Sequence, residues 1–135
     1  MIARLTLGLV MFPHGAQKLL GIFGGYGFKG TMSYFTGTLH LNALLAFLVI
    51  MIEFFGSLSL LAGFATRIWA FALIVVMAGI LITSTHVQNG FFMNWTGQQA
   101  GEGYEYHLLV IGLALTLLFT GGAKWSVDSL IVQAP

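Results

Sequence analysis

The sequence predicts an all-α membrane protein, a four-helix transmembrane bundle. Of its 135 residues, 58% are hydrophobic and 7% are charged, whereas an ordinary soluble domain carries roughly 25% charged residues. Five basic and four acidic residues are too few to build a water-facing surface of the usual charge density. Four apolar stretches are long enough to cross a bilayer. We therefore expect a single domain over residues 1–135, with the lipid bilayer as its solvent.

The predicted spans differ in how strongly the sequence supports them. Residues 68–87 form a run of 20 without a charge, and such a helix is about 30 Å long, which matches the hydrocarbon core. Residues 41–64 form a second apolar run, in which Glu53 is the one charged residue. Residues 104–120 supply the last span, and the glycine pair that follows them is typical of a helix end.

Residues 2–20 are expected to form the first span, although polar residues interrupt it. Arg4, His14 and Lys18 lie within this stretch. Pro13 is tolerated in a membrane helix but kinks it. A cleaved signal peptide is not expected. Pro13, His14 and Lys18 interrupt the apolar region that such a peptide needs, and no small-residue cleavage pattern precedes Gly21.

Basic residues set the predicted orientation. Arg4, Arg67 and Lys124 flank the predicted spans on one side, and cytoplasmic flanks carry an excess of such residues. Both termini are therefore expected in the cytoplasm. The two longer connections, residues 21–40 and 88–105, are expected on the outer side.

Both outer connections are rich in glycine and aromatic residues. Residues 21–40 hold six glycines and include Tyr26, and residues 88–105 hold four glycines and include Phe91 and Trp95. Glycine permits tight turns, and aromatic side chains favour the membrane interface. Two interpretations stay open: a lid whose aromatic rings stack on a ligand, or an interfacial belt.

Charge and cysteine content exclude several functions. A net charge of +1 provides no basic surface for nucleic acid, so no nucleic-acid partner is expected. The chain has no cysteine, which excludes disulfides, thiolate nucleophiles and iron–sulfur clusters. Any redox chemistry must use a different group.

Ionisable residues inside the predicted spans are the strongest functional signal, because such residues are rare in membranes and face a bundle interior or a polar cavity. Arg4, Met11 and Lys18 recur every seven residues, and on a helix His14 lies within about 80° of their line. Gly15 beside this stripe lets a neighbouring helix approach closely. The stripe is therefore expected to face protein.

Several of these groups converge on the outer leaflet. Lys18 and His14 lie near the outer end of the first span, while His86 closes the third span and Glu105 opens the fourth. Glu53 lies deeper in its span and needs a proton or a cation nearby. We expect these five residues to carry the site.

Structural roles compete with this interpretation. Arg4 and Arg67 are expected to be structural polar residues, since arginine commonly anchors a span at the interface. His86 can cap its own helix, and the helix dipole stabilises a carboxylate in the first turn, such as Glu105, without any catalysis. His107, beside a connection, is expected at the interface and not as a ligand.

Six short segments together resemble the DoxX family of bacterial membrane proteins. They are residues 14–19 (HGAQKL), 23–27 (FGGYG), 53–56 (EFFG), 66–67 (TR), 86–95 (HVQNGFFMNW) and 103–106 (GYEY). Their order and spacing carry the resemblance, which extends from Ile2 to about Asp128. It implies a multi-pass four-helix bundle in the bacterial inner membrane. It also implies conservation of Arg4, His14, Lys18, Glu53, His86 and Glu105.

The resemblance further implies a role in redox metabolism, because the family takes its name from a subunit of a quinone-linked oxidoreductase. A quinone carbonyl needs hydrogen-bond donors, and quinone reduction needs protons. His14 and His86 are therefore expected to bind a quinone, Lys18 to offset negative charge, and Glu53 or Glu105 to relay protons. The expected partners are the lipid bilayer, a quinone-like molecule, and either redox proteins or a second copy of the chain.

Two alternatives remain. His14 and His86 could instead be axial ligands of a haem, or ligands of a metal ion, because they lie on different helices. The chain could also be a transporter, assembly factor or scaffold without enzymatic activity. In that case the polar stripe is a structural network that holds the helices in register.

Overall fold

The computed structural model describes residues 1–133, which form helices and contain no strand. In chain order the elements are α1 (Ile2–Leu20), α2 (Gly27–Ser33), the π-helical turn η1 (Tyr34–Thr38), α3 (Ala43–Met51), the π-helical turn η2 (Ile52–Gly56), α4 (Ser57–Ala62), α5 (Thr66–Thr83), α6 (Glu105–Thr120) and α7 (Val127–Gln133). The chain is therefore all-helical over its described length.

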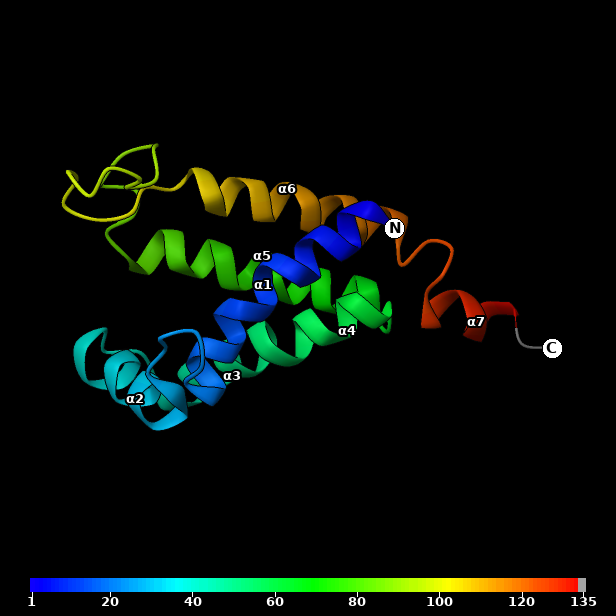
Figure 1. Ribbon diagram of the computed structural model, residues 1–135, viewed down its shortest axis with the longest axis horizontal. Coiled ribbons are helices and arrows are strands. Elements are labelled where there is room, and N and C mark those ends of the chain that lie inside the picture. Colours follow the sequence, from blue (N-terminus) through cyan, green and yellow to red (C-terminus); the bar gives the residue numbers. More distant parts are fainter. Residues whose placement is uncertain (134–135) are drawn as a thin grey trace.

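Four long helical segments lie side by side along the molecule (Figure 1). They are α1, the continuous segment α3–η2–α4, α5 and α6, with the most extensive packing between α5 and α6. The start of α1 and helix α7 lie at one end, here named the terminal end. The connections 21–42 and 84–104 lie at the opposite end, here named the loop end.

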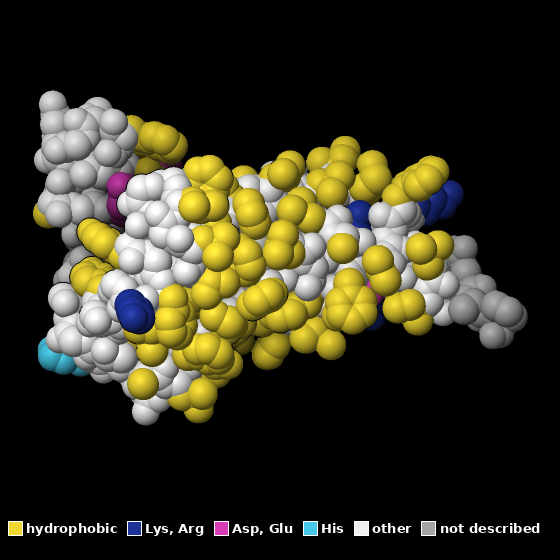
Figure 2. All heavy atoms as spheres, turned by 60° about the horizontal axis from the view of Figure 1, so that its bottom comes forward, with side chains coloured by type: hydrophobic (Ala, Val, Ile, Leu, Met, Phe, Trp, Pro, Cys, Tyr) yellow, Lys and Arg dark blue, Asp and Glu magenta, His cyan; other side chains and the backbone are white. Residues whose placement is uncertain are grey.

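A narrow apolar core runs between the long helices. Its fully buried members are Leu7 and Met11 of α1, Leu60 of α4, Ala70, Leu73, Val76 and Met77 of α5, and Val110, Ala114 and Leu117 of α6. Many large hydrophobic side chains remain exposed on the outside of these helices. Figure 2 shows hydrophobic side chains along the length of the visible face, with charged side chains toward the two ends.

Two helical segments are long and apolar enough to cross a membrane. They are Ala43–Ala62 with 20 residues and Thr66–Thr83 with 18 residues. Helix α6 is a shorter apolar helix. Helix α1 has 19 residues, but Arg4, Pro13 and Lys18 interrupt its apolar sequence.

Helix α5 is displaced toward the terminal end relative to the predicted range 68–87. It begins at Thr66 because the Asp128 carboxylate accepts hydrogen bonds from the amides of Ala65, at 2.7 Å, and Thr66, at 2.9 Å. It ends at Thr83, since the next residue is extended. His86 therefore does not close the helix as expected but lies in the turn that follows it.

Three short elements have no counterpart in the sequence prediction. Helix α2 and the π-helical turn η1 fold the first outer connection into helix, so that connection is not an open loop. Helix α7 follows the last long helix. Helices of five to seven residues are too short to show a hydrophobic period, and tertiary contacts determine whether they form.

Candidate functional site

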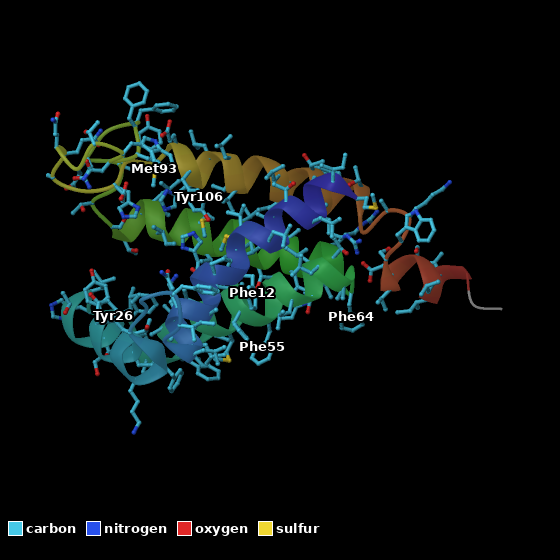
Figure 3. The ribbon with its side chains drawn as sticks, viewed as in Figure 1. Phe12, Tyr26, Phe55, Phe64, Met93 and Tyr106 are labelled. Carbon is cyan, nitrogen blue, oxygen red and sulfur yellow. The ribbon has the colours of Figure 1, made fainter. Side chains whose placement is uncertain are left out.

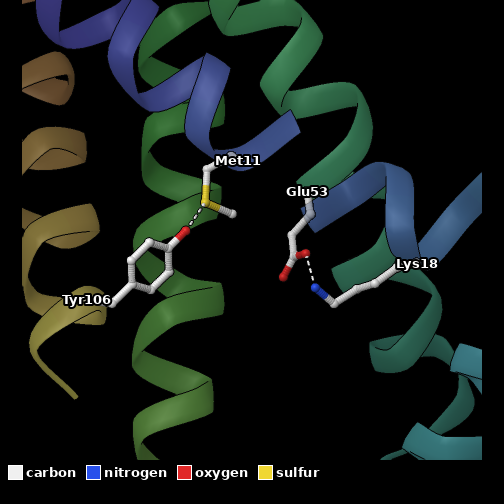
Figure 4. A network of polar contacts seen from close by, with 4 residues as sticks. All are labelled: Met11, Lys18, Glu53 and Tyr106. Atoms are coloured by element: carbon white, nitrogen blue, oxygen red, sulfur yellow. Dashed lines mark hydrogen bonds and ion pairs between the residues drawn. The ribbon is translucent and has the colours of Figure 1, made fainter. Parts of the chain in front are cut away.

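An ion pair between two long helices lies at the centre of the candidate site. The Lys18 ammonium of α1 contacts the Glu53 carboxylate of η2 (Figure 4). The Glu53 side chain is 2% exposed and that of Lys18 is 24% exposed. A buried carboxylate needs a cation or a proton, and Lys18 supplies the cation. The sequence predicted both residues as site members but did not predict their contact.

Glu53 lies in a π-helical turn and not in a regular α-helix. The turn η2 interrupts the segment between α3 and α4 at Ile52–Gly56. Such turns are rare and occur frequently at functional sites. Ser57, at the next position, donates its hydroxyl to the carbonyl of Phe54 at 2.7 Å. The altered helix geometry therefore coincides with the buried carboxylate.

Gly15 explains how Lys18 reaches Glu53. A Cβ atom at Gly15 would lie 2.5 Å from the backbone nitrogen of Phe54 and 2.6 Å from the backbone carbon of Glu53. Only glycine allows α1 to approach η2 this closely. The sequence predicted a close approach at this residue, and the structure has it.

A row of rings extends from α1 across α6 to the turn after α5. The ring of His14 lies 5.6 Å from that of Tyr106, Tyr106 lies 5.7 Å from His107, and His107 lies 4.8 Å from His86, all between ring centroids. Tyr106 also donates its hydroxyl to the Met11 sulfur at 3.4 Å (Figure 4). His14, Lys18, Glu53, His86, Tyr106 and His107 are here named the loop-end polar group.

His107 is the member of this group that sequence reasoning misplaced. It is 5% exposed, and its Nε2 lies 3.2 Å from Nδ1 of His86. Its own Nδ1 is buried and forms no hydrogen bond of ordinary geometry with a described residue, and the backbone of Tyr104 is its polar neighbour. Buried polar atoms of this kind are uncommon and often mark a site for a ligand or water. Its position in the first turn of α6, next to Tyr106, could have indicated that His107 belongs to this group.

His14 is exposed on the side of α1, so its imidazole is accessible. It lies within electrostatic reach of both Lys18 and Glu53. Histidine, lysine and a carboxylate together supply donors, an acceptor and a positive charge at one place. These are the groups that polarise a carbonyl and hold a proton beside it.

Glu105 opens α6 and contacts the second outer connection. Its Oε1 accepts hydrogen bonds from the amide of Met93 at 2.9 Å and from the indole of Trp95 at 3.4 Å. These contacts tie the second connection to the start of α6. The structure therefore gives Glu105 an organising role in this connection.

The aromatic residues predicted to stack a ligand lie on the outer connections. Tyr26 is 81% exposed and Trp95 is 86% exposed, and Figure 3 shows Tyr26 at the loop end. Phe91 packs edge to face on Phe92 and on Tyr104. None of these contacts joins the loop-end polar group, and the stacking role stays a prediction.

The terminal end holds a second set of buried polar residues. Arg4 is 2% exposed and donates from Nη2 to the carbonyl of Trp125 at 2.9 Å. Burial raises the pKa of Asp128, but hydrogen bonds from Thr66 and Ala65 and the charge of Arg4 outweigh it and hold the pKa below its ordinary value. Through these hydrogen bonds Asp128 caps the start of α5.

Arg67 lies at the same end of the molecule. It donates from Nη2 to the carbonyl of Phe119 at 3.2 Å, close to the last turn of α6. The guanidinium is exposed. It therefore joins the start of α5 to the end of α6.

The described residues do not favour a haem or metal between His14 and His86. His86 faces His107, and His14 lies against Tyr106, so each imidazole has a different ring as its neighbour. Within residues 1–133 no three histidine or carboxylate side chains are grouped as metal ligands would be. A metal-binding role therefore has no support from this geometry.

Two cavities on the surface lie at the terminal end, away from the loop-end polar group. The larger has a volume of about 630 Å³ and is lined by residues of the 65–68, 121–123 and 126–132 segments. The other lies beside Lys124 and Trp125.

Comparison with known proteins identifies the family. The sequence model of the DoxX family matches residues 1–86, which is more than half of the chain. The chain belongs to the DoxX family. The matched range includes four members of the loop-end polar group, namely His14, Lys18, Glu53 and His86. DoxX proteins are membrane-associated, in agreement with the two apolar helices.

One relative of this DoxX protein carries a functional name. A protein of Bacillus subtilis (strain 168) named "Putative oxidoreductase CatD" is 29% identical over 133 residues, which cover 98% of this chain and 87% of the relative. No solved structure matches the chain. The comparisons thus give family membership and an association with oxidoreductases.

Proposed function

We propose that this DoxX protein binds a quinone-like ligand beside its loop-end polar group, as a subunit of a membrane oxidoreductase. The observation that carries the proposal is the buried ion pair of Lys18 with Glu53, next to the exposed imidazole of His14. Ionisable side chains inside a span are expensive and mark ligand or proton pathways. Here three of them meet at one level of the bundle.

The proposal includes a transmembrane arrangement. The four long segments α1, α3–η2–α4, α5 and α6 would each cross the bilayer, with both termini in the cytoplasm. At 1.5 Å per residue, α6 is about 24 Å long, so the bilayer would thin locally around it or aromatic residues at its ends would anchor it. The orientation rests on Arg4, Arg67 and Lys124 at the terminal end.

The chain's own residues would do the following. His14 donates a hydrogen bond to one carbonyl of the ring, and Lys18 stabilises negative charge that develops on it. The pair of His86 with His107 offers a second hydrogen-bonding position, and Glu53 holds or accepts a proton. The ligand would supply the redox couple, since the chain has no cysteine. Electrons would come from a partner protein.

The name of the relative from Bacillus subtilis supports the same class of activity. The bacterial inner membrane would be the location, because membrane quinones dissolve in that bilayer.

Ligand binding by purified protein tests the proposal. A short-chain ubiquinone and a short-chain menaquinone are titrated into wild-type protein and into His14→Ala. Because His14 is exposed, its removal should preserve the fold. Loss of one hydrogen bond of about 1 kcal/mol predicts affinity weaker by about fivefold.

His40→Asn serves as the matched control. His40 is exposed at the loop end with φ 54°, and asparagine tolerates this left-handed conformation. This variant should bind quinone like the wild type. Equal affinity of wild type, His14→Ala and His40→Asn for both quinones would refute the proposed site.

A structural role without enzymatic activity is the second candidate, as in a transporter, assembly factor or scaffold. The close contact of Gly15 with η2 favours it, because lipid provides no hydrophobic force between helices and close packing must replace it. In that case the wild-type protein binds no quinone, so His14→Ala has no binding to weaken. No quinone binding by folded wild-type protein would favour this function.

A further inference from the structure

Two histidines join the end of α5 to the start of α6 at the loop end. Nδ1 of His86, in the turn after α5, lies 3.2 Å from Nε2 of His107, in the first turn of α6. Among the hydrogen bonds that residues 84–88 form with other described residues, this one reaches α6. It therefore fixes the start of the second outer connection to α6. The pair of His86 with His107 is here named the histidine latch.

The latch depends on a single hydrogen between the two rings. A neutral imidazole carries hydrogen on one nitrogen, so one ring must donate and the other must accept. The backbone of Tyr104 is the polar neighbour of Nδ1 of His107, which favours a hydrogen on that nitrogen. Nε2 of His107 is then the acceptor, and Nδ1 of His86 is the donor.

The latch tolerates one added proton but not two. The first proton can bind Nε2 of His86, which is partly exposed, and the hydrogen between the rings stays in place. A second proton would occupy Nε2 of His107, so that two donors and two positive charges would face each other at 3.2 Å. His107 is 5% exposed, and water screens such repulsion poorly at a buried site. The doubly protonated pair must therefore separate.

The immediate neighbours of the latch do not offset a second charge. Within residues 1–133 no carboxylate forms an ion pair or a hydrogen bond with either ring. The ring of Tyr106 packs on His107 at 5.7 Å between centroids, and the amide of His86 donates to the Ser84 hydroxyl at 3.2 Å. Neither tyrosine nor serine carries a negative charge at neutral pH.

The charged side chains of the surrounding elements have other partners. Glu102 and Glu105 accept hydrogen bonds from backbone amides of the second outer connection. Glu53 of η2 pairs with Lys18 of α1. Glutamate ordinarily titrates near pH 4.3 and histidine near pH 6.5. Between pH 7 and pH 5 the latch therefore responds through its own two histidines.

We propose that the histidine latch is a pH-sensitive switch that opens when both rings are protonated. At neutral pH the contact holds residues 84–88 on α6. In acid the second proton breaks the contact, and this segment separates from α6. Tyr106 then loses the ring that packs on it, and Tyr106 is the neighbour of His14. Acid would thereby loosen the loop-end polar group. The latch does not depend on quinone binding.

Counting protons predicts how steeply the latch responds. The closed latch binds one proton, whereas both histidines titrate independently when it is open. Below the ordinary pKa of histidine, about 6.5, the open state therefore binds one proton more. The equilibrium constant for opening should then rise by about tenfold for each pH unit that the pH falls. Well above that pKa both rings are neutral in either state, and the constant should not change with pH.

Hydrogen exchange of the purified full chain in detergent tests the proposal. The amides of Ser84, Asn89 and Gly90 donate hydrogen bonds to backbone carbonyls, so residues 84–90 report opening. Mass spectrometry follows this segment at pH 7, 6 and 5, after correction for the intrinsic pH dependence of exchange. Protection of the segment should fall by about tenfold between pH 6 and pH 5. Peptides from the middle of α5 and α6 should change by less than about twofold.

Two variants of the latch should remove the pH response in opposite ways. In His86→Gln the side-chain amide can donate to His107 or accept from it, so the contact survives protonation. Residues 84–90 should then stay protected at both pH 6 and pH 5. His107→Phe removes the contact at every pH. The segment should then exchange at pH 6 as fast as it does in the acid-opened wild type.

Three further variants are controls for the remaining titratable groups. His40→Asn and His14→Ala remove the two histidines outside the latch, and both should keep the tenfold response. Glu105→Gln retains an oxygen that accepts from the amide of Met93 and should also keep it. Together with the latch variants, these changes cover all four histidines of the chain.

Three results would overturn the proposal. Unchanged protection of residues 84–90 in wild-type protein between pH 7 and pH 5 would show that the latch does not open. A tenfold response that persists in His86→Gln and His107→Phe would assign it to another group. Loss of the response in any of the three controls would do the same. If His107→Phe does not fold, a wild-type acid response in His86→Gln refutes the latch.

Discussion

The two ends of the molecule both bury charged side chains, but they use different partners. At the terminal end, Asp128 accepts from two backbone amides and Arg4 donates to a backbone carbonyl. At the loop end, Lys18 pairs with the Glu53 side chain, and His86 faces His107. Backbone partners are fixed by the fold, whereas side-chain partners can rearrange. The terminal end therefore organises the chain, and the loop end is the better place for chemistry.

The difference extends to how the buried polar groups are paired. At the terminal end the Asp128 carboxylate has the amides of Ala65 and Thr66 and the Thr66 hydroxyl as partners, while at the loop end the rings of His86 and His107 face each other through their nitrogens. An imidazole nitrogen suits exchange of a proton. We therefore propose that ligand chemistry belongs to the loop end.

The largest expected effect follows from breaking the loop-end ion pair on one side. Lys18→Ala leaves the Glu53 carboxylate buried without a cation, so it should lower the free energy of unfolding by roughly 3 kcal/mol. Denaturant titration of the purified protein in detergent measures it. A loss below about 1 kcal/mol would mean that Glu53 does not depend on Lys18.

A smaller loss is expected at the helix crossing beside that pair. Gly15→Ala would place a methyl group against the backbone of η2 and should cost about 2 kcal/mol. Gly79→Ala on α5 is the control, because no atom lies within 4 Å of the added Cβ. That control should be neutral or stabilising by up to about 1 kcal/mol. Equal effects of the two variants would contradict the close approach.

At the terminal end, Asp128→Asn should cost about 1 kcal/mol at neutral pH because it weakens the cap of α5. The folded pKa of Asp128 lies below the ordinary value of 3.8. Its contribution is therefore complete above that value and is lost as the pH falls through the folded pKa. Unfolding curves between pH 7 and pH 2 should show a smaller acid loss in the variant. Parallel pH profiles would contradict the capping role.

The smallest effect is expected for His107→Phe. Phenylalanine fills a similar volume; the variant loses the contact with His86 at 3.2 Å, but the other ring nitrogen makes no hydrogen bond of ordinary geometry. Replacing a poorly satisfied polar group by an apolar one of similar shape is nearly neutral, within about 1 kcal/mol. A loss above about 2 kcal/mol would mean that the imidazole is fully hydrogen-bonded.

Much of the helical pattern could be predicted from the sequence. The stretches 2–20, 41–64 and 104–120 agree with helical segments to within two residues at each end, because long apolar runs need no tertiary information. The end of α5 could not be predicted, since the apolar run continues to residue 87 whereas the helix stops at Thr83, where Ser84 becomes extended. Helix α7 is too short to show a period.

The candidate site was predictable as a set of residues but not as a set of contacts. Spacing placed Lys18 and His14 on one face of a helix, and the cost of a buried charge singled out Glu53. The spacing of residues along one helix does not show how that helix is aligned with its neighbours. The ion pair and the contact of His86 with His107 therefore could not be predicted from the sequence. Tyr106, which contacts Met11 and His14 of α1, was missed as a site residue for the same reason.

The central claim is that the loop-end polar group binds a ligand and does more than hold helices together. The double variant Lys18→Met with Glu53→Leu removes both charges but keeps apolar volume, so stability should stay within about 1 kcal/mol of wild type. Quinone affinity of this folded variant is the decisive measurement. We predict a loss of at least about tenfold. Wild-type affinity in the stable double variant would contradict the account.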